Sequence, residues 1–153
     1  MANIFSPEWD IDRDDPPYRW QRARLGRQAG ARQLGASLFH VEPGAETFPL
    51  HIHYANEELL VVVAGRPTLH TLEGSRPLEP GEVVAFPAGR EGAHRLGNDG
   101  DEPARLLVVS TMNAPDINEF PELGQYWVRD YVPGTDAPDG ALDVHVRPID
   151  AGS

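Results

Sequence analysis

The sequence predicts an all-β protein, a sandwich or barrel built from short strands. About seven apolar segments of strand length are separated by turn signals every 8–12 residues or so, which is the spacing seen in β-sandwiches and barrels. Fifteen glycines and fifteen prolines, spread along the 153 residues, favour many short elements over long helices. By its length the chain forms one domain, which is large enough for a hydrophobic core.

The first 33 residues are expected to form an N-terminal arm (residues 1–33). Residues 10–17 contain four aspartates and end in two prolines, whereas residues 19–32 carry five arginines. This basic run could hold an anionic substrate, although a solvated face or a contact with acidic residues of another subunit is the commoner role. Trp9 and Trp20 indicate that the arm packs against a surface, because aromatic side chains bury large areas.

The barrel itself is expected over residues 34–112. Its apolar or alternating segments lie at residues 34–41, 50–53, 58–63, 67–72, 83–86, 94–96 and 105–111. In the third of these, alternation places Glu58, Leu60 and Val62 on one side of the strand. The other side is equally apolar, so it needs cover from a second sheet, the arm or another subunit.

The remaining residues, 113–153, lose this rhythm and are expected to form an irregular C-terminal extension. Residues 116–122 are predicted to be a loop, and residues 125–131 a short strand or a cover over the barrel. Residues 142–147 could pair with the edge of a sheet. The extension would pack on the barrel or on a partner subunit.

A potential metal site lies in the first half of the barrel region. His51 and His53 are one residue apart, so in a strand both side chains point to the same side. Glu58 begins the apolar run that ends at Gly65, and if the two strands are neighbours, three metal-competent side chains converge. Imidazoles with a carboxylate suit zinc, iron, manganese or nickel, whereas calcium prefers oxygen ligands. One histidine alone would more often be a packing residue, but the trio at this spacing favours a metal site.

Two motifs carry a resemblance to the cupin family. Residues 44–65 are similar to its first motif, with one residue more than usual before His51. Residues 81–98 are similar to its second motif, with two residues more than usual before His94 and the usual spacing from His94 to Asn98. The motifs cover about a third of the chain and are specific when taken together.

The resemblance implies a double-stranded β-helix, or jelly-roll, barrel. It also implies that a divalent metal ion is bound by His51, His53, Glu58 and His94, and that Asn98 belongs to a turn. Small bacterial proteins with a single cupin barrel are the most similar, and many of them have no assigned activity. The resemblance therefore defines fold and metal ligands better than it defines a reaction.

Two classes of function follow from this ligand set. The first is a metal-dependent enzyme acting on a small oxygen-bearing molecule, as a dioxygenase, isomerase or lyase. Three imidazoles and one carboxylate would leave two positions of an octahedral ion open for it. The alternative is a non-catalytic module that binds a sugar or an acid, since the fold alone does not decide function. His40, His70 and His145 have no companion at ligand spacing and are expected to be structural or exposed.

Composition excludes several other classes. The chain has no cysteine and its 13 basic residues are all arginine, so thiol and lysine Schiff-base chemistry are excluded. A net charge of −11 argues against nucleic acids and anionic membranes as partners. Without a membrane-length apolar run or a secretion signal, a soluble cytoplasmic protein is expected. We also expect a homodimer built on the apolar outer face of the barrel, with the arm contributing.

Overall fold

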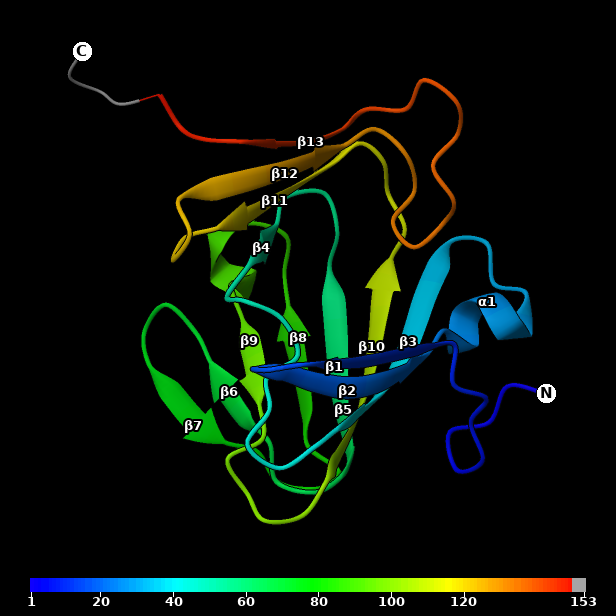
Figure 1. Ribbon diagram of the computed structural model, residues 1–153, viewed down its shortest axis with the longest axis vertical. Coiled ribbons are helices and arrows are strands. Elements are labelled where there is room, and N and C mark those ends of the chain that lie inside the picture. Colours follow the sequence, from blue (N-terminus) through cyan, green and yellow to red (C-terminus); the bar gives the residue numbers. More distant parts are fainter. Residues whose placement is uncertain (150–153) are drawn as a thin grey trace.

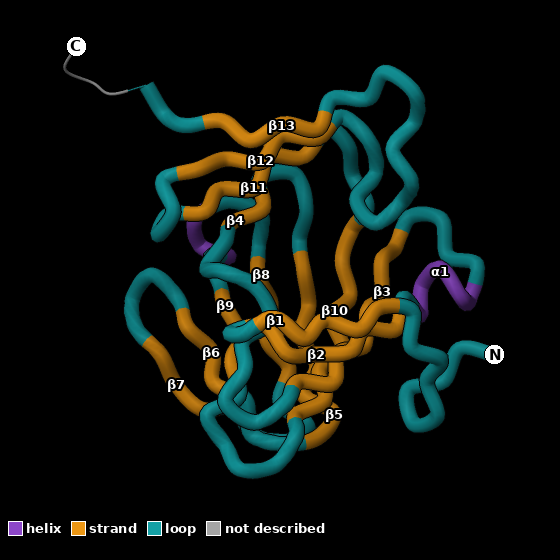
Figure 2. The backbone as a smooth tube through the Cα atoms, viewed as in Figure 1, coloured by secondary structure: helices purple, strands orange, loops and turns teal. Residues whose placement is uncertain are grey.

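The computed structural model describes residues 1–149 and contains three antiparallel sheets (Figures 1 and 2). The largest sheet contains, in spatial order, β1 (Ile11–Asp15), β2 (Tyr18–Ala23), β3 (Leu34–Val41), β10 (Ala104–Thr111), β5 (Glu58–Ala64) and β8 (Val83–Phe86). A second sheet contains β13 (Asp143–Val146), β12 (Gln125–Arg129), β11 (Asp116–Phe120) and β4 (Ile52–His53). The third contains β7 (Ser75–Pro77), β6 (Thr68–His70) and β9 (Arg95–Gly97).

The prediction of an all-β jelly-roll fold is confirmed. Helical structure in the described residues is limited to α1 (Leu25–Ala29) and a 3-10 turn at Arg90–Gly92. Across residues 1–149, neither has the length or apolar character that crossing a membrane would require. In Figure 1, β11, β12 and β13 lie across one end of the molecule, above the ends of β3, β5 and β10.

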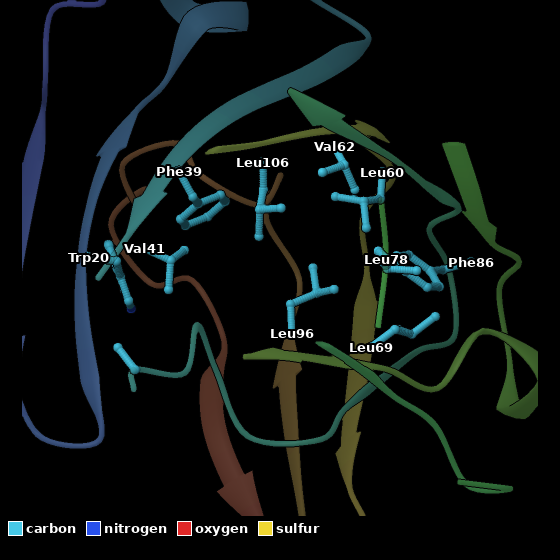
Figure 3. Packing of buried hydrophobic residues seen from close by; sticks show 11 residues of the cluster. Trp20, Phe39, Val41, Leu60, Val62, Leu69, Leu78, Phe86, Leu96 and Leu106 are labelled. Atoms are coloured by element: carbon cyan, nitrogen blue, oxygen red, sulfur yellow. The ribbon is translucent and has the colours of Figure 1, made fainter. Parts of the chain in front are cut away.

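The hydrophobic core is formed by the inward faces of the strands. Leu60 and Val62 are fully buried, as the alternation along residues 58–63 predicts. Figure 3 shows the cluster to which they belong, with Trp20, Phe39, Val41, Leu69, Leu78, Phe86, Leu96 and Leu106. Residues from the six-stranded and three-stranded sheets therefore close around one apolar interior, whose burial supplies most of the stability of the fold.

The outer face of the large sheet is only partly covered. Leu38 is buried there beside α1, and Ile4 and Trp9 from the N-terminal residues pack against this second cluster. Leu59 and Val83 on neighbouring strands stay 40% and 56% exposed. The apolar outer face predicted from the sequence thus exists, and the first ten residues of the chain cover a part of it.

Residues 11–23 form a hairpin that the sequence did not reveal. β2 pairs with β3, so that Trp20 lies opposite Val41, and the hairpin extends the largest sheet. Trp20 is 5% exposed, and its Nε1 donates a hydrogen bond of 2.8 Å to the carbonyl of Thr47. It is therefore a core residue, and the packing of the N-terminal residues against a surface that Trp9 and Trp20 indicated is confirmed. The division of the chain at residue 33 stays a prediction.

The prediction of a loop at residues 116–122 is wrong, because residues 116–120 form β11. This strand pairs with both β4 and β12. Its alternation is inverted, since Asp116 and Asn118 are buried while Ile117 is 41% exposed. A half-buried strand usually turns its apolar residues inward, so a strand with the inverted pattern is not recognised from the sequence. The strand expected within residues 125–131 and the edge pairing expected within residues 142–147 are confirmed as β12 and β13.

Candidate metal centre

The structure brings together the four residues that the two motifs single out. One potential ligand atom from each of His51, His53 and Glu58 lies within 4.8 Å of the others. The Nε2 atom of His94 is 3.1 Å from Oε2 of Glu58, and Nε2 of His53 is 3.6 Å from the same oxygen. His94 thus meets the group through Glu58 and is not one of the three residues within 4.8 Å of one another, and within the described residues His40, His70 and His145 are not among those three.

The backbone explains why these side chains meet. Glu58 begins β5 and pairs with Phe86 on one side and Ser110 on the other. His51 and His94 form an isolated antiparallel bridge with two backbone hydrogen bonds, of 3.1 and 3.0 Å, and their ring centroids are 4.5 Å apart. The ring of Phe86 stacks on His94 with centroids 3.7 Å apart, which restricts the rotation of that imidazole.

The longer loop before His94 is accommodated by a 3-10 turn. Gly92 N donates a hydrogen bond of 3.0 Å to the carbonyl of Gly89, which closes the turn. A Cβ atom at Gly92 would lie 1.8 Å from the carbonyl oxygen of Pro87, so only glycine fits there. The two additional residues are taken up by this turn, and His94 still reaches Glu58.

All three histidines are oriented by a hydrogen bond from Nδ1. The acceptors are the carbonyl of Pro49 for His51 at 2.8 Å, Asp116 Oδ2 for His53 at 3.0 Å, and the carbonyl of Gly92 for His94 at 2.8 Å. Carbonyl and carboxylate oxygens accept only, so in each neutral ring the proton is on Nδ1 and Nε2 keeps a free lone pair. Histidines that bind metals are held in this way by their second nitrogen.

The charge states suit a divalent cation. Burial lowers the pKa of His51 to about 3, helped by the nearby His94 and His53, so this ring is neutral at physiological pH. Burial raises the pKa of Glu58, but the interactions with His94, His53 and His51 outweigh burial and lower it to about 2. Glu58 is therefore ionised.

Buried Oε2 of Glu58 has no hydrogen-bond donor among the described residues. Its contact with Nε2 of His94 joins two acceptors and becomes favourable only when a cation lies between them, either a proton or a metal ion. Ligand atoms that share an ion at about 2.1 Å lie up to about 4.2 Å apart, and the 3.1 and 3.6 Å distances fall in that range. The residues present thus fit a divalent metal ion.

Asp116 is a member of the site that sequence reasoning missed. It is fully buried on β11 and accepts hydrogen bonds from His53 and from the backbone N–H of Ala55. Burial lowers the pKa of His53, but the hydrogen bond to Asp116 and the charges of Glu58 and Asp116 outweigh it and raise the pKa. Asn118 contacts the same ring and accepts a 3.0 Å hydrogen bond from Arg129. The one signal in the sequence was the Asp-x-Asn spacing, which places both side chains on one face of a strand.

The metal-competent group opens onto a cavity of about 620 Å³. Its walls near the histidines are largely apolar and include Phe39, Phe48, Leu96 and Phe120. Phe86 stacks on His94 and packs in the core. A cavity of this size and character is typical of sites for small molecules.

A jelly roll with three histidines and a glutamate facing an internal cavity defines a class of small barrel proteins with a metal site inside the barrel. A family model described as "Cupin domain" matches residues 37–110. A structure from Silicibacter pomeroyi, a sugar phosphate isomerase of the cupin superfamily, is 28% identical, with a TM-score of 0.78 over 99% of this chain and 97% of that chain. The chain belongs to the cupin superfamily.

Two further structures are similar. A protein from Acidithiobacillus ferrooxidans, provisionally assigned as a sugar phosphate isomerase, is 30% identical, with a TM-score of 0.73 over 81% of this chain and 79% of that chain. The polyketide cyclase RemF from Streptomyces resistomycificus is 23% identical, with a TM-score of 0.61 over 76% of this chain and 82% of that chain, and shares the fold. No match was found among curated protein sequences.

We predict that the protein, purified without chelator, carries about one equivalent of a divalent metal and that His94→Ala loses most of it. Removing one of four ligands leaves the ion with a gap in its coordination, so affinity should fall as strongly as for His53→Ala. Elemental analysis and metal titration measure this. His70→Ala is the matched control, because His70 lies on β6 outside the group. Parent-like metal binding by His94→Ala would show that another residue is the ligand.

We predict that Asp116→Asn weakens metal binding about 10- to 100-fold, the usual effect of losing a carboxylate that orients a metal-binding histidine. The same change should lower the pH at which a proton competes with the metal for His53. Asp116 raises the pKa of His53, so in the parent a proton competes with the metal below that raised pKa, and affinity falls as pH decreases. In the variant this fall should begin at lower pH. Metal titrations from pH 5.5 to 8 test it, and identical pH profiles would contradict it.

Proposed function

We propose that the protein is a metal-dependent cupin enzyme that isomerises a small, sugar-like hydroxycarbonyl compound. The main supporting observation is that three Nε2 lone pairs and an ionised carboxylate converge without a donor between them and open onto a cavity. Among the reactions that the ligand set permits, isomerisation is favoured because the structural relative at 28% identity is named a sugar phosphate isomerase and the one at 30% is provisionally assigned as one. Dioxygenase and lyase chemistry have no comparable support.

In this proposal His51, His53, Glu58 and His94 would hold iron, manganese, zinc or nickel. When bound, such an ion supplies a Lewis acid that polarises a substrate oxygen. The Nδ1 hydrogen bonds keep the Nε2 atoms pointed inward, and Asp116 keeps the proton of His53 on Nδ1. Phe48 and Phe120 would exclude water from the substrate carbons. Because the group lines the cavity on one side, at least one coordination position would stay free for substrate.

The test is turnover of aldoses, ketoses and their derivatives by protein loaded in turn with Fe, Mn, Ni or Zn. We expect interconversion of an aldose and ketose, or of two epimers, that stops after chelation and returns when metal is added back. His53→Ala should lower kcat/KM by about 100-fold or more, the scale of losing a principal electrostatic contribution, while His70→Ala should stay close to the parent. Saturable sugar binding without turnover for any metal would support the non-catalytic binding module instead.

We further propose that the protein is a cytoplasmic homodimer whose subunits meet on the outer face of the large sheet. Leu59 and Val83 lie on adjacent strands and stay 40% and 56% exposed, although α1 and the N-terminal residues cover the neighbouring part of that face. Light scattering at micromolar concentration should give about twice the 16.8 kDa chain mass. Val83→Glu should shift the protein toward monomer, whereas Leu72→Glu, at an exposed turn away from this face, should not. A parent protein that is monomeric would refute the dimer.

A further inference from the structure

The cavity of the metal-competent group is lined by five arginines, namely Arg22, Arg24, Arg27, Arg32 and Arg129. Two of them, Arg22 and Arg24, are two residues apart in the sequence. Arg22 lies on β2, on the face that also carries Trp20, and Arg24 follows at the end of that strand. Nε of Arg22 donates a hydrogen bond of 3.0 Å to Ser37 Oγ, and its guanidinium carbon lies 5.4 Å from the centre of the Phe39 ring. These contacts hold the guanidinium in a defined position. Its two terminal nitrogens donate no hydrogen bond within residues 1–149 and are free to bind a ligand.

This pair of charges lacks an adequate counter-ion. The chain has 24 acidic residues against 13 arginines, yet Arg22 forms no ion pair with a carboxylate in the described part of the chain. Arg24 has a distant partner in Asp10, at 3.9 Å, and its buried Nε has no hydrogen-bond acceptor. Burial and the nearby charge of Arg24 lower the pKa of Arg22, and the carboxylates of Glu58 and Asp10 offset this only in part.

An uncompensated cation in a partly buried place is costly, and it is retained where a ligand supplies the opposite charge. Guanidinium groups match the oxygens of phosphates and carboxylates in geometry and charge. Two neighbouring arginines carry two positive charges, which correspond to a phosphate dianion better than to a single carboxylate.

We propose that Arg22 and Arg24 form the anion subsite of the cavity and bind the phosphate of a phosphate monoester substrate. The proposal rests on the proposed function in one respect, namely that the oxygen-bearing end of the same molecule lies at the metal centre. It assigns the substrate as a phosphorylated polyol or sugar rather than a free sugar. Arg22 is a binding and specificity-determining residue, with Ser37 as its positioning residue.

Calorimetric titration with inorganic phosphate, acetate, ribose 5-phosphate and ribose tests this on the full chain, both metal-loaded and after chelation. We expect phosphate and ribose 5-phosphate to bind more tightly than acetate and ribose, and phosphate binding to persist without metal. Arg22→Gln and Arg24→Gln should each weaken binding of the two phosphates by about tenfold or more, since each removes a charge-assisted hydrogen bond. Arg76→Gln is the matched control, because Arg76 pairs with Glu82 on the surface and does not line the cavity.

Metal content and thermal unfolding of each variant show whether it remains folded. The phosphate affinity of each variant is compared with that of the parent separately. Phosphate binding that is unchanged in both Arg22→Gln and Arg24→Gln, or that requires the metal, would overturn the subsite. Acetate binding as tightly as phosphate would overturn the assignment of a phosphate monoester. Phosphate binding at the arginines without any isomerase turnover would leave this inference standing and remove the proposed function. Turnover of free sugars that Arg22→Gln leaves unchanged would support the proposed function and overturn this inference.

Discussion

Two backbone hydrogen bonds between His51 and His94 are the constraint on which the centre depends. They join the segment before β4 to the segment before β9, although these strands belong to different sheets. The side-chain period of a strand is two residues, so a shift of one residue in this pairing would turn one ring away from the other. His53 then follows on the same side as His51, and the start of β5 brings Glu58 to the same place. The register of one small bridge therefore decides whether the four candidate ligands meet.

The sequence was informative where the site is local. Period-two alternation predicts that His51 and His53 share one side of a strand. The convergence of Glu58 with them was predicted on the condition that the two strands are neighbours, whereas β4 and β5 lie in different sheets and Glu58 still meets the two histidines. The strand at 58–63 and its buried Leu60 and Val62 follow from the same rule. Placing His94 required the resemblance to a known motif, because its proximity to Glu58 arises from pairing across the barrel.

The parts that could not be predicted depend on partners far along the chain. β11 buries Asp116 and Asn118 because they bind His53 and Arg129, and Asp116 is 63 residues from His53 in sequence. Read locally, two polar residues around one isoleucine look like a loop. The hairpin of β1 and β2 was not predicted for the same reason. Arg22 on β2 faces inward because it lines the cavity, and the sequence alone does not reveal this. Predictions from local periodicity assume that the inward-facing residues of a strand are apolar. This assumption fails where the inward-facing residues line a functional site.

Each of the strands that line the barrel interior carries inward-facing polar residues toward one end and inward-facing apolar residues toward the other. On β5 the inward residues run from Glu58 to Leu60 and Val62, and the register aligns Ser110 of β10 with Glu58. The same order recurs on the neighbouring strands, from Arg22 to Trp20 on β2, from Ser37 to Phe39 and Val41 on β3, and from Ser110 to Val108 and Leu106 on β10. One end of the barrel is thus a packed core, and the other is a cavity with buried charges. The buried charges reduce the free energy of unfolding. Each strand can carry an inward-facing polar residue only because the rest of its inward face is buried in the core.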